Sequence, residues 1–176
     1  MENGLKQFIR RTYWLIIVAV LIAALDQITK WLVIKYIPYG GIWNPWEWLA
    51  PYARIVHWSN TGAAFGLLQG MNPVFIGLAI LVTLGIVYYY QTVEDNDRLI
   101  KMGLMFVLGG AVGNLIDRFN HGHVIDMISV GNFAVFNIAD SFITVGVVIL
   151  VIGVWVQDKR EKSKQIAAEE QEEGLL

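Results

Sequence analysis

The chain contains no cysteine among its 176 residues. This absence excludes disulfides, thiolate zinc sites, iron–sulfur clusters and a cysteine nucleophile. Charge is also scarce, because only 16% of the residues are charged and the formal net charge is -2. The chain therefore lacks the basic surface that nucleic-acid binding usually needs, and it carries no nucleic-acid recognition motif. We predict no nucleic-acid partner.

Hydrophobic residues are abundant instead. They make up 56% of the chain, which indicates a membrane protein rather than a soluble domain. Four apolar runs approach the roughly 20 residues that a helix needs to cross a bilayer. They cover residues 13–34, 73–90, 99–116 and 139–156. We therefore predict a mainly α-helical membrane protein, with one four-helix domain over residues 1–164 and an acidic, solvated or disordered cytoplasmic tail over residues 165–176.

The N-terminal segment has two interpretations. Basic residues followed by an apolar core are typical of a cleavable signal peptide. However, no A-x-A cleavage pattern follows the core, and apolar character resumes as WLVI after the polar group from Asp26 to Lys30. The segment is therefore predicted to remain as the first membrane helix.

Positive charges near the two termini predict the orientation of the chain in the membrane. Three basic residues precede the first span and four follow the fourth, namely Lys6, Arg10, Arg11, Lys159, Arg160, Lys162 and Lys164. Lysine and arginine are enriched in short segments on the cytoplasmic side. An even number of spans places both termini on one side, so both clusters predict cytoplasmic termini. The loop between the second and third spans carries charges of both signs, so it adds little to the prediction of orientation.

The connection over residues 35–72 is the longest and is predicted to lie on the outer side. It contains four tryptophans, whose rings favour the headgroup level, so part of this loop is expected to lie along the membrane. The stretch ARIVHWS is rich in β-formers and predicts a small extracytoplasmic β element. Asn72-Pro73 suits the start of the second helix, because proline is favoured in the first helical turn.

Polar residues within or beside the apolar runs gather near the outer end of the predicted bundle. This set comprises Asp26, Lys30, Asn60, Asn114, Asp117, Arg118, Asp126 and Asp140. Ionisable groups at membrane depth are costly and usually mark function. Asp26 and Lys30 share one helical face, where they form either a functional pair or a merely neutralising one. Asp117 and Arg118 are adjacent and do not face each other, so an ion pair that anchors a loop is the favoured role for them.

Two further groups favour a structural interpretation. Gly109, Gly110 and Gly113 are interpreted as helix-packing positions rather than as a phosphate-binding loop. His121 and His123 have no third ligand nearby in the sequence, so they are interpreted as loop histidines. No metal site is predicted.

Asp126 and Asp140 are the strongest candidates for chemistry. The SVGNF stretch between them supplies turn residues that let the two side chains meet. Asp140 also lies at the start of the fourth span, where a helix N-cap is the alternative interpretation. Two carboxylates close together in a poorly solvated site share one proton and titrate as a pair. Such a pair supplies a general base and a general acid for peptide hydrolysis, as in aspartic proteases, without a metal or a covalent intermediate.

Five motifs follow one another along the chain, namely DQITK (26–30), NTGAAFG (60–66), GGAVGNLIDR (109–118), VIDMI (124–128) and FNIADS (136–141). Together they resemble the lipoprotein signal peptidases, signal peptidase II. The resemblance implies a bacterial inner-membrane aspartic endopeptidase with its active site near the outer, periplasmic face. It implies that the substrates are diacylglyceryl-modified prolipoproteins. The enzyme would encounter them within membrane lipid and cut them N-terminal to the lipidated cysteine. It also implies inhibition by globomycin-type cyclic peptides.

The resemblance implies roles for individual residues. The catalytic pair falls on Asp126 and Asp140. The positions that bind substrate or support the pair fall on Asp26, Lys30, Asn60, Gly62, Asn114, Arg118, Asn137 and Ser141. No cofactor and no metal are implied, and the chain does not depart from the family within these motifs.

Two rival functions remain open. A Ser/Lys membrane peptidase would use Ser129 or Ser141 with Lys30 as the base, although Asp26 one turn away favours the charged form of that lysine. A transporter or proton channel also places Asp and Lys in membrane helices. Relays need polar groups through the depth of the bilayer, and the second and fourth spans have almost none in their middles. The pattern therefore favours chemistry at the membrane surface.

Overall fold

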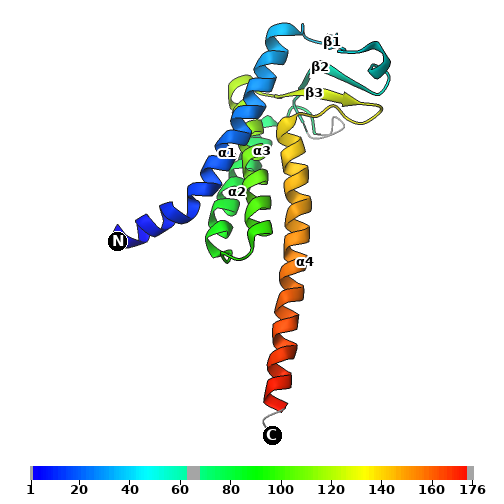
Figure 1. The fold of residues 1–176 in the computed structure, drawn as a ribbon. Coiled ribbons are helices and arrows are strands. Elements are labelled where there is room, and N and C mark those ends of the chain that lie inside the picture. The colour runs from blue at the N-terminus through cyan, green and yellow to red at the C-terminus, as the bar shows by residue number, and fades with distance from the viewer. Residues whose placement is uncertain (1, 63–67, 174–176) are drawn as a thin grey trace.

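The computed structural model describes residues 2–62 and 68–173. Long helices and a small group of strands follow one another along the chain (Figure 1). The helices are α1 (Glu2–Tyr36), α2 (Asn72–Thr92), α3 (Arg98–His121) and α4 (Ile138–Glu173). The strands are β1 (Ile42–Trp43), β2 (Ala53–Asn60) and β3 (Val124–Val130), with a short 3₁₀ helix at Glu47–Leu49. The predicted fold class, a mainly helical membrane protein with a small β element, is confirmed.

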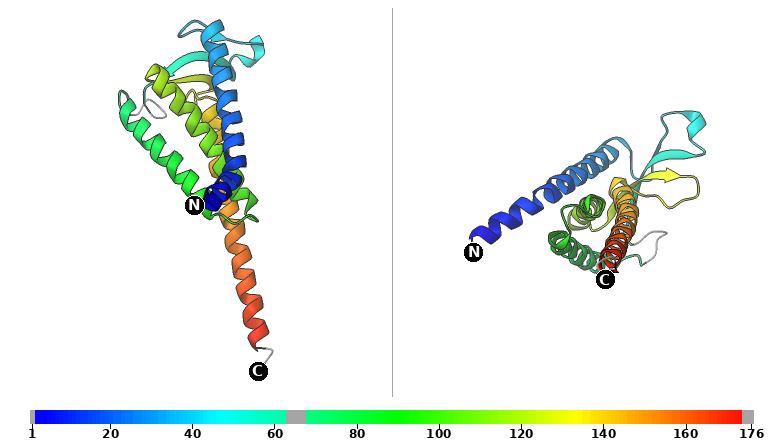
Figure 2. Two further views of the ribbon diagram at one scale, coloured as in Figure 1. Left: turned by 90° about the vertical axis from the view of Figure 1, so that its left-hand side faces the viewer. Right: turned by 60° about the horizontal axis from the view of Figure 1, so that its bottom comes forward.

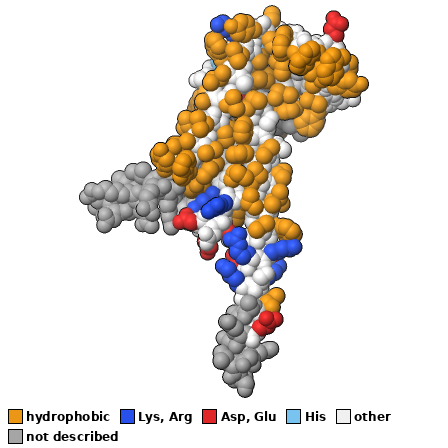
Figure 3. Space-filling view, in the orientation of Figure 1, with side chains coloured by type: hydrophobic (Ala, Val, Ile, Leu, Met, Phe, Trp, Pro, Cys, Tyr) orange, Lys and Arg blue, Asp and Glu red, His pale blue; other side chains and the backbone are white. Residues whose placement is uncertain are grey.

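Each long helix contains a stretch that is long and apolar enough to cross a membrane, and these stretches cover residues 12–36, 72–92, 98–121 and 138–166. They contain the four predicted spans. Helix α4 continues to Glu173, because the alanine, glutamine and glutamate residues of the acidic tail are good helix formers. Apolar side chains cover most of the face of the bundle in view, and most of the Lys and Arg side chains in view gather at the end away from the sheet (Figure 3).

Helix α3 is the centre of the bundle, and α1, α2 and α4 pack around it (Figure 2). Glycines allow this close packing. A Cβ atom on Gly109 would lie 2.6 Å from Cβ of Ile22 on α1, a distance that real Cβ atoms do not reach. Gly110 and Gly113 have no room for a side chain either. The interpretation of these glycines as helix-packing positions is confirmed.

The sheet is antiparallel, with strand order β1-β2-β3, and it lies where α1 ends and α4 begins (Figure 1). Strand β2 contains the ARIVHWS stretch in which the sequence predicts β structure. Strand β3 is not predicted from the sequence. The register pairs Trp58 with Asp126 and Asn60 with Val124. Strand β2 therefore brings Asn60 beside the strand that carries Asp126.

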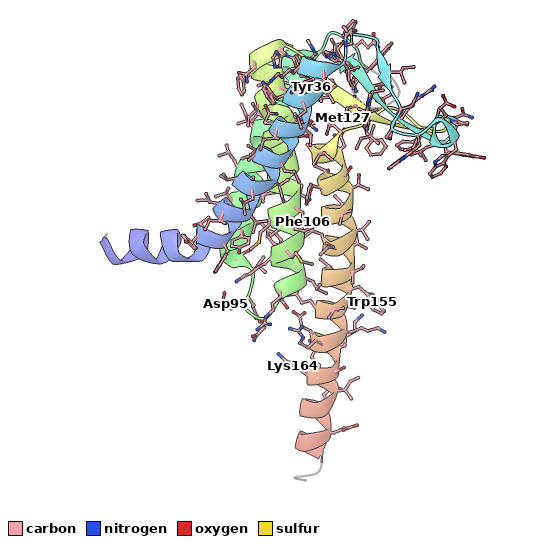
Figure 4. All side chains as sticks on the ribbon, turned by 45° about the horizontal axis from the view of Figure 1, so that its top comes forward. Tyr36, Asp95, Phe106, Met127, Trp155 and Lys164 are labelled. Carbon is pink, nitrogen blue, oxygen red and sulfur yellow. The ribbon has the colours of Figure 1, made fainter. Side chains whose placement is uncertain are left out.

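Two apolar clusters hold these elements together. One joins α1, α2 and α3 and includes Leu15, Ala19, Ile86, Tyr90, Ile100, Leu104 and Leu108. The other docks the sheet on the end of α1, where Met127 of β3 (Figure 4) packs with the buried residues Val33 and Ile37. Because this second cluster fixes β3 against α1, it sets the position of Asp126 relative to the helices.

Candidate active site

Asp126 lies in the middle of β3 and is 2% exposed. Its Oδ2 accepts a hydrogen bond from Nδ2 of Asn60 at 3.1 Å, and its Oδ1 accepts one from Nδ2 of Asn137 at 2.9 Å. The backbone N–H of Gly62 donates to Oδ1 of Asn60 at 3.0 Å and so orients that amide. The rest of the NTGAAFG motif, residues 63–66, lies outside the described residues. A rigid strand therefore supplies this carboxyl group, and two amide side chains fix its direction.

Asp140 lies in the first turn of α4. Its backbone N–H donates to Oδ1 of Asn137 at 2.9 Å, and the backbone N–H of Asn137 donates back to Oδ2 of Asp140 at 3.2 Å. This reciprocal pair is a capping box, with Asn137 as the N-cap and Asp140 three residues later. The alternative interpretation of Asp140 as the N-cap itself is therefore wrong by three positions, although its carboxylate does take part in the cap.

The remaining oxygen of Asp140, Oδ1, accepts a hydrogen bond from Nδ2 of Asn114 on α3 at 2.7 Å. Arg118 lies one turn further along α3, where its Nη1 donates to the carbonyl oxygen of Asn114 at 3.3 Å and its guanidinium lies over the ring of Phe75. Ser141 donates from Oγ to the carbonyl oxygen of Asn137 at 3.0 Å. These residues form a polar wall around the two aspartates.

Both aspartates open on one cavity of about 600 Å³ between α2, α3, β3 and the start of α4. The sequence predicts that the two side chains meet, and the structure brings both to this space. The predicted residues that line the cavity are Asn60, Gly62, Asn114, Arg118, Asp126, Asp140 and Ser141. Much of the remaining wall is apolar and includes Phe75, Phe133 and Phe136. An apolar cavity with a few convergent polar groups is the usual form of a ligand or substrate site.

The environment of Asp126 favours its protonated form. Burial, and after it the negative charge of Asp140, raise the pKa of the Asp126 carboxyl to about 7. The hydrogen bonds from Asn60 and Asn137 and the charge of Lys30 oppose this shift. The two carboxyl groups are therefore electrostatically coupled, as the sequence predicts for a pair that shares a proton.

Asp26 and Lys30 lie behind the cavity wall rather than in it. The Nζ of Lys30 lies 2.7 Å from a carboxylate oxygen of Asp26, which confirms the predicted pair, and 2.7 Å from Oδ2 of Asp117. Asp117 also accepts the backbone N–H of Ile125 at 3.0 Å. The favoured loop-anchoring role of Asp117 is therefore confirmed, with Lys30 as its charged partner.

The structure adds one polar residue that the sequence reading missed. Gln27 donates from Nε2 to Oδ1 of Asp117 at 2.8 Å and to Oδ2 of Asp26 at 3.3 Å. The capping box was also missed, although N-x-x-D before an apolar run is a readable signal. The rings of His121 and His123 lie 5.9 Å apart. Within residues 2–62 and 68–173, no three His, Asp or Glu side chains come together as metal ligands do.

Four apolar helices with two aspartates on one cavity are the architecture expected of a membrane aspartic peptidase. The family described as signal peptidase (SPase) II, peptidase family A8, matches residues 18–156. The chain belongs to the signal peptidase II family, and the resemblance seen in the five motifs is confirmed.

Individual relatives agree with this assignment. The chain is 41% identical over 150 residues to a lipoprotein signal peptidase of Shouchella clausii, covering 83% of this chain and 95% of the relative. It is 40% identical over 152 residues to that of Bacillus subtilis, covering 84% of this chain and 97% of the relative. A solved bacterial membrane enzyme superimposes with a TM-score of 0.74 at 29% identity, covering 84% of this chain and 90% of the other. The chain is therefore a bacterial membrane protein with four spans and lipoprotein signal peptidase function, whose substrates are prolipoproteins.

Proposed function

We propose that Asp126 and Asp140 activate a water molecule to cleave diacylglyceryl-modified prolipoproteins N-terminal to the lipidated cysteine. The observation that carries this proposal is the opening of two coupled carboxyl groups on one largely apolar cavity. One buried carboxyl group whose pKa lies near neutrality beside a second carboxyl group is the arrangement that acid–base peptide hydrolysis requires.

The two aspartates have different roles in this proposal. Asp126 carries the shared proton, because its pKa of about 7 keeps it protonated up to neutral pH. Asp140 acts as the carboxylate, in the first turn of α4 where the helix dipole favours negative charge. It removes a proton from water as the water oxygen attacks the scissile carbonyl carbon, while Asp126 donates its proton to the carbonyl oxygen. The tetrahedral intermediate then collapses as its C–N bond breaks: the proton held by Asp140 passes to the departing amine, and Asp126 takes back a proton from one hydroxyl group of the intermediate.

The surrounding residues support the pair. Asn60 and Asn137 hold the Asp126 carboxyl group, and Asn114 holds that of Asp140. Gly62 and Ser141 fix Asn60 and Asn137 in turn. Arg118 lines the same cavity as the only cation in its described wall and offers donors to a substrate carbonyl or to the developing oxyanion.

The orientation in the membrane follows from charge. Most of the basic side chains in view gather at the end of the bundle opposite the sheet (Figure 3). This distribution favours cytoplasmic termini and an active site near the outer, periplasmic face of the inner membrane. Four tryptophans of the first loop are exposed and suit a segment that lies at the headgroup level, namely Trp43, Trp46, Trp48 and Trp58.

With this orientation, a substrate with one apolar signal helix and two acyl chains enters sideways from the lipid and presents its scissile bond at the bilayer boundary. Globomycin-type peptides would occupy the same cavity over the aspartates.

The two rival functions find less support. A Ser/Lys mechanism needs a neutral lysine, and Lys30 is buried between the carboxylates of Asp26 and Asp117. Ser129 is not among the residues that line the cavity, and Ser141 already donates to a backbone carbonyl. Activity that survives Ser129→Ala and Ser141→Ala removes this rival. Proton flux through the purified chain in vesicles, without peptide cleavage, would instead favour transport.

A direct test uses the purified chain in proteoliposomes and a synthetic prolipoprotein peptide with or without a diacylglyceryl group on its cysteine. Mass spectrometry of the products locates the cut bond. We expect cleavage only of the lipidated peptide, at the bond before the modified cysteine. Equal cleavage of both peptides, or a cut elsewhere, would contradict the proposed substrate.

A further inference from the structure

We propose that Asp26, Lys30 and Asp117 form a buried ionic clamp that sets the relative positions of Asp126 and Asp140 by holding the backbone directly before each of them. This inference rests on the proposed catalytic role of the two aspartates. It makes the members of the clamp positioning residues, since they do not line the cavity.

The clamp is withdrawn from water. Lys30 is 1% exposed, Asp26 is 0% exposed and Asp117 is 1% exposed. The ammonium of Lys30 lies 2.7 Å from Asp26 Oδ2 and 2.7 Å from Asp117 Oδ2, and it donates to Oδ1 of Asn114 at 3.1 Å. A lysine has three donors, so all of them are satisfied inside the protein. Removing one partner from such a cluster is costly, because it leaves a buried charge uncompensated.

Each carboxylate of the clamp also accepts one backbone N–H from a different element. Asp117 accepts the N–H of Ile125 at 3.0 Å, and Asp26 accepts the N–H of Ala139 at 3.0 Å. Ile125 directly precedes Asp126, and Ala139 directly precedes Asp140. Helix α3 therefore holds the strand that carries Asp126, and helix α1 holds the helix that carries Asp140. Lys30 joins these two contacts by pairing with both carboxylates.

A third connection reaches the second aspartate through a side chain. Lys30 donates to Oδ1 of Asn114, and Nδ2 of the same amide donates to Oδ1 of Asp140. Because Lys30 holds Oδ1 of Asn114, the Nδ2 group of the same amide points toward Asp140. Only Nδ2 can donate a hydrogen bond.

The clamp opposes electrostatic repulsion between Asp126 and Asp140. Two carboxyl groups near each other repel when both are ionised, and the repulsion is strong in a poorly solvated cavity. Asp126 and Asp140 come from different elements, so this repulsion acts to separate β3 from α4. Contacts to the two preceding N–H groups oppose that separation at the points where it would begin. General acid–base chemistry tolerates only small displacements of its groups.

The clamp also contributes charge. One lysine and two carboxylates give it a formal charge of 1 − 2 = −1, and the charge of Lys30 acts on Asp126 directly. The charged groups that face Asp126 are Asp140 from α4, Lys30 from α1 and Arg118 from α3. Removing one carboxylate from the clamp leaves more of the Lys30 charge uncompensated, which favours the ionised form of Asp126.

The test is Asp117→Asn, which keeps the size of the side chain and an oxygen acceptor but removes the charge. We expect kcat to fall about 10- to 100-fold with KM little changed, because the reacting groups move while the substrate cavity remains. We also expect the alkaline limb of the pH–rate profile to move to lower pH. A purely structural role would lower the melting temperature without moving that limb.

The matched control is Asp97→Asn. Asp97 is also a buried aspartate in an ion pair, with Arg160 at 3.0 Å, but it directly precedes α3, at the end of that helix away from the sheet. Its replacement is expected to lower the melting temperature while kcat and the pH profile of the folded protein stay as in the wild type.

The outcomes test the positioning role of the clamp separately from the proposed catalytic function. Unchanged kcat in Asp117→Asn overturns the clamp, and so does a reduced kcat with an unmoved alkaline limb. If Asp117→Asn does not fold, Gln27→Ala decides instead, because it removes a hydrogen bond to Asp117 without changing charge. A reduced kcat with KM unchanged supports the clamp, and wild-type kcat overturns it. Each of these results leaves the requirement for Asp126 and Asp140 untouched, since that requirement is measured on those residues themselves.

Discussion

Asn137 donates a hydrogen bond from its side-chain Nδ2 to Oδ1 of Asp126 at 2.9 Å. The same residue exchanges two hydrogen bonds with Asp140 through the capping box of α4. Asn137 is fully buried, with 0% exposure. One residue therefore connects the two aspartates. The hydrogen bonds that cap the start of α4 also belong to the candidate active site.

Asn137→Ala is expected to impair both stability and catalysis. Loss of an N-cap costs about 1 kcal/mol, and a buried acceptor left without its donor costs about 1–3 kcal/mol more. We expect a lower melting temperature and a reduced kcat, measured by thermal unfolding in detergent and by prolipoprotein cleavage. Asn137→Ser is the control, because serine caps a helix well but is too short to hold Asp126. It is expected to recover part of the stability and little of the activity, and wild-type behaviour of the alanine variant would contradict this account.

The pH dependence of cleavage reports on Asp126. Because its pKa is raised to about 7 by burial and by the charge of Asp140, the proposed acid is protonated below this pH and loses its proton above it. We expect kcat/KM to decline above pH about 7 with a slope of one proton. A rate that stays constant well into the alkaline range would show that the chemistry does not need this proton.

The same shift gives a prediction for stability. The pKa of Asp126 is about 7 in the folded protein and 3.8 in its ordinary state, so the folded chain binds the extra proton between these values. The contribution of Asp126 to folding is therefore fully present below pH 3.8 and is lost as the pH rises through about 7. Asp126→Asn removes this dependence. The check is the difference in melting temperature between wild type and variant across the pH series, which should favour the variant more as the pH rises.

Close packing of α3 gives a prediction away from the site. Gly109→Ala places a methyl group 2.6 Å from Cβ of Ile22, so α1 and α3 must separate and we expect destabilisation of about 1–3 kcal/mol. Gly77→Ala on α2 is the matched control, since a Cβ there meets nothing within 4 Å. It is expected to be neutral or to stabilise the helix by up to about 1 kcal/mol. Equal melting temperatures for the two variants would contradict the packing argument.

The helical part of this fold can be predicted from the sequence because lipid imposes a length on every span. The ends of the helices are less predictable, as α4 shows, since good helix formers continue it beyond the membrane stretch to Glu173. Strand β3 was missed because its stabilisation comes from pairing with β2, which is distant in sequence, and because Asp126 interrupts its apolar pattern.

In the candidate site too, contacts between residues near in sequence can be predicted, whereas contacts between packed helices cannot. The pair of Asp26 with Lys30 follows from helical spacing, and the approach of Asp126 to Asp140 follows from the turn between them. The contact of Lys30 with Asp117 joins two helices and depends on how α1 packs on α3, which no local pattern specifies. Gln27 was missed for the same reason, since its partners on α3 become neighbours only after packing.

The most direct measurement is the cleavage rate of a diacylglyceryl prolipoprotein by Asp126→Asn and by Asp140→Asn, beside Asp97→Asn as a folded control. We expect each of the first two variants to insert into the membrane and fold but to show no measurable turnover, while the control cleaves at the wild-type rate. Turnover at the wild-type rate by either active-site variant would contradict the shared-proton mechanism.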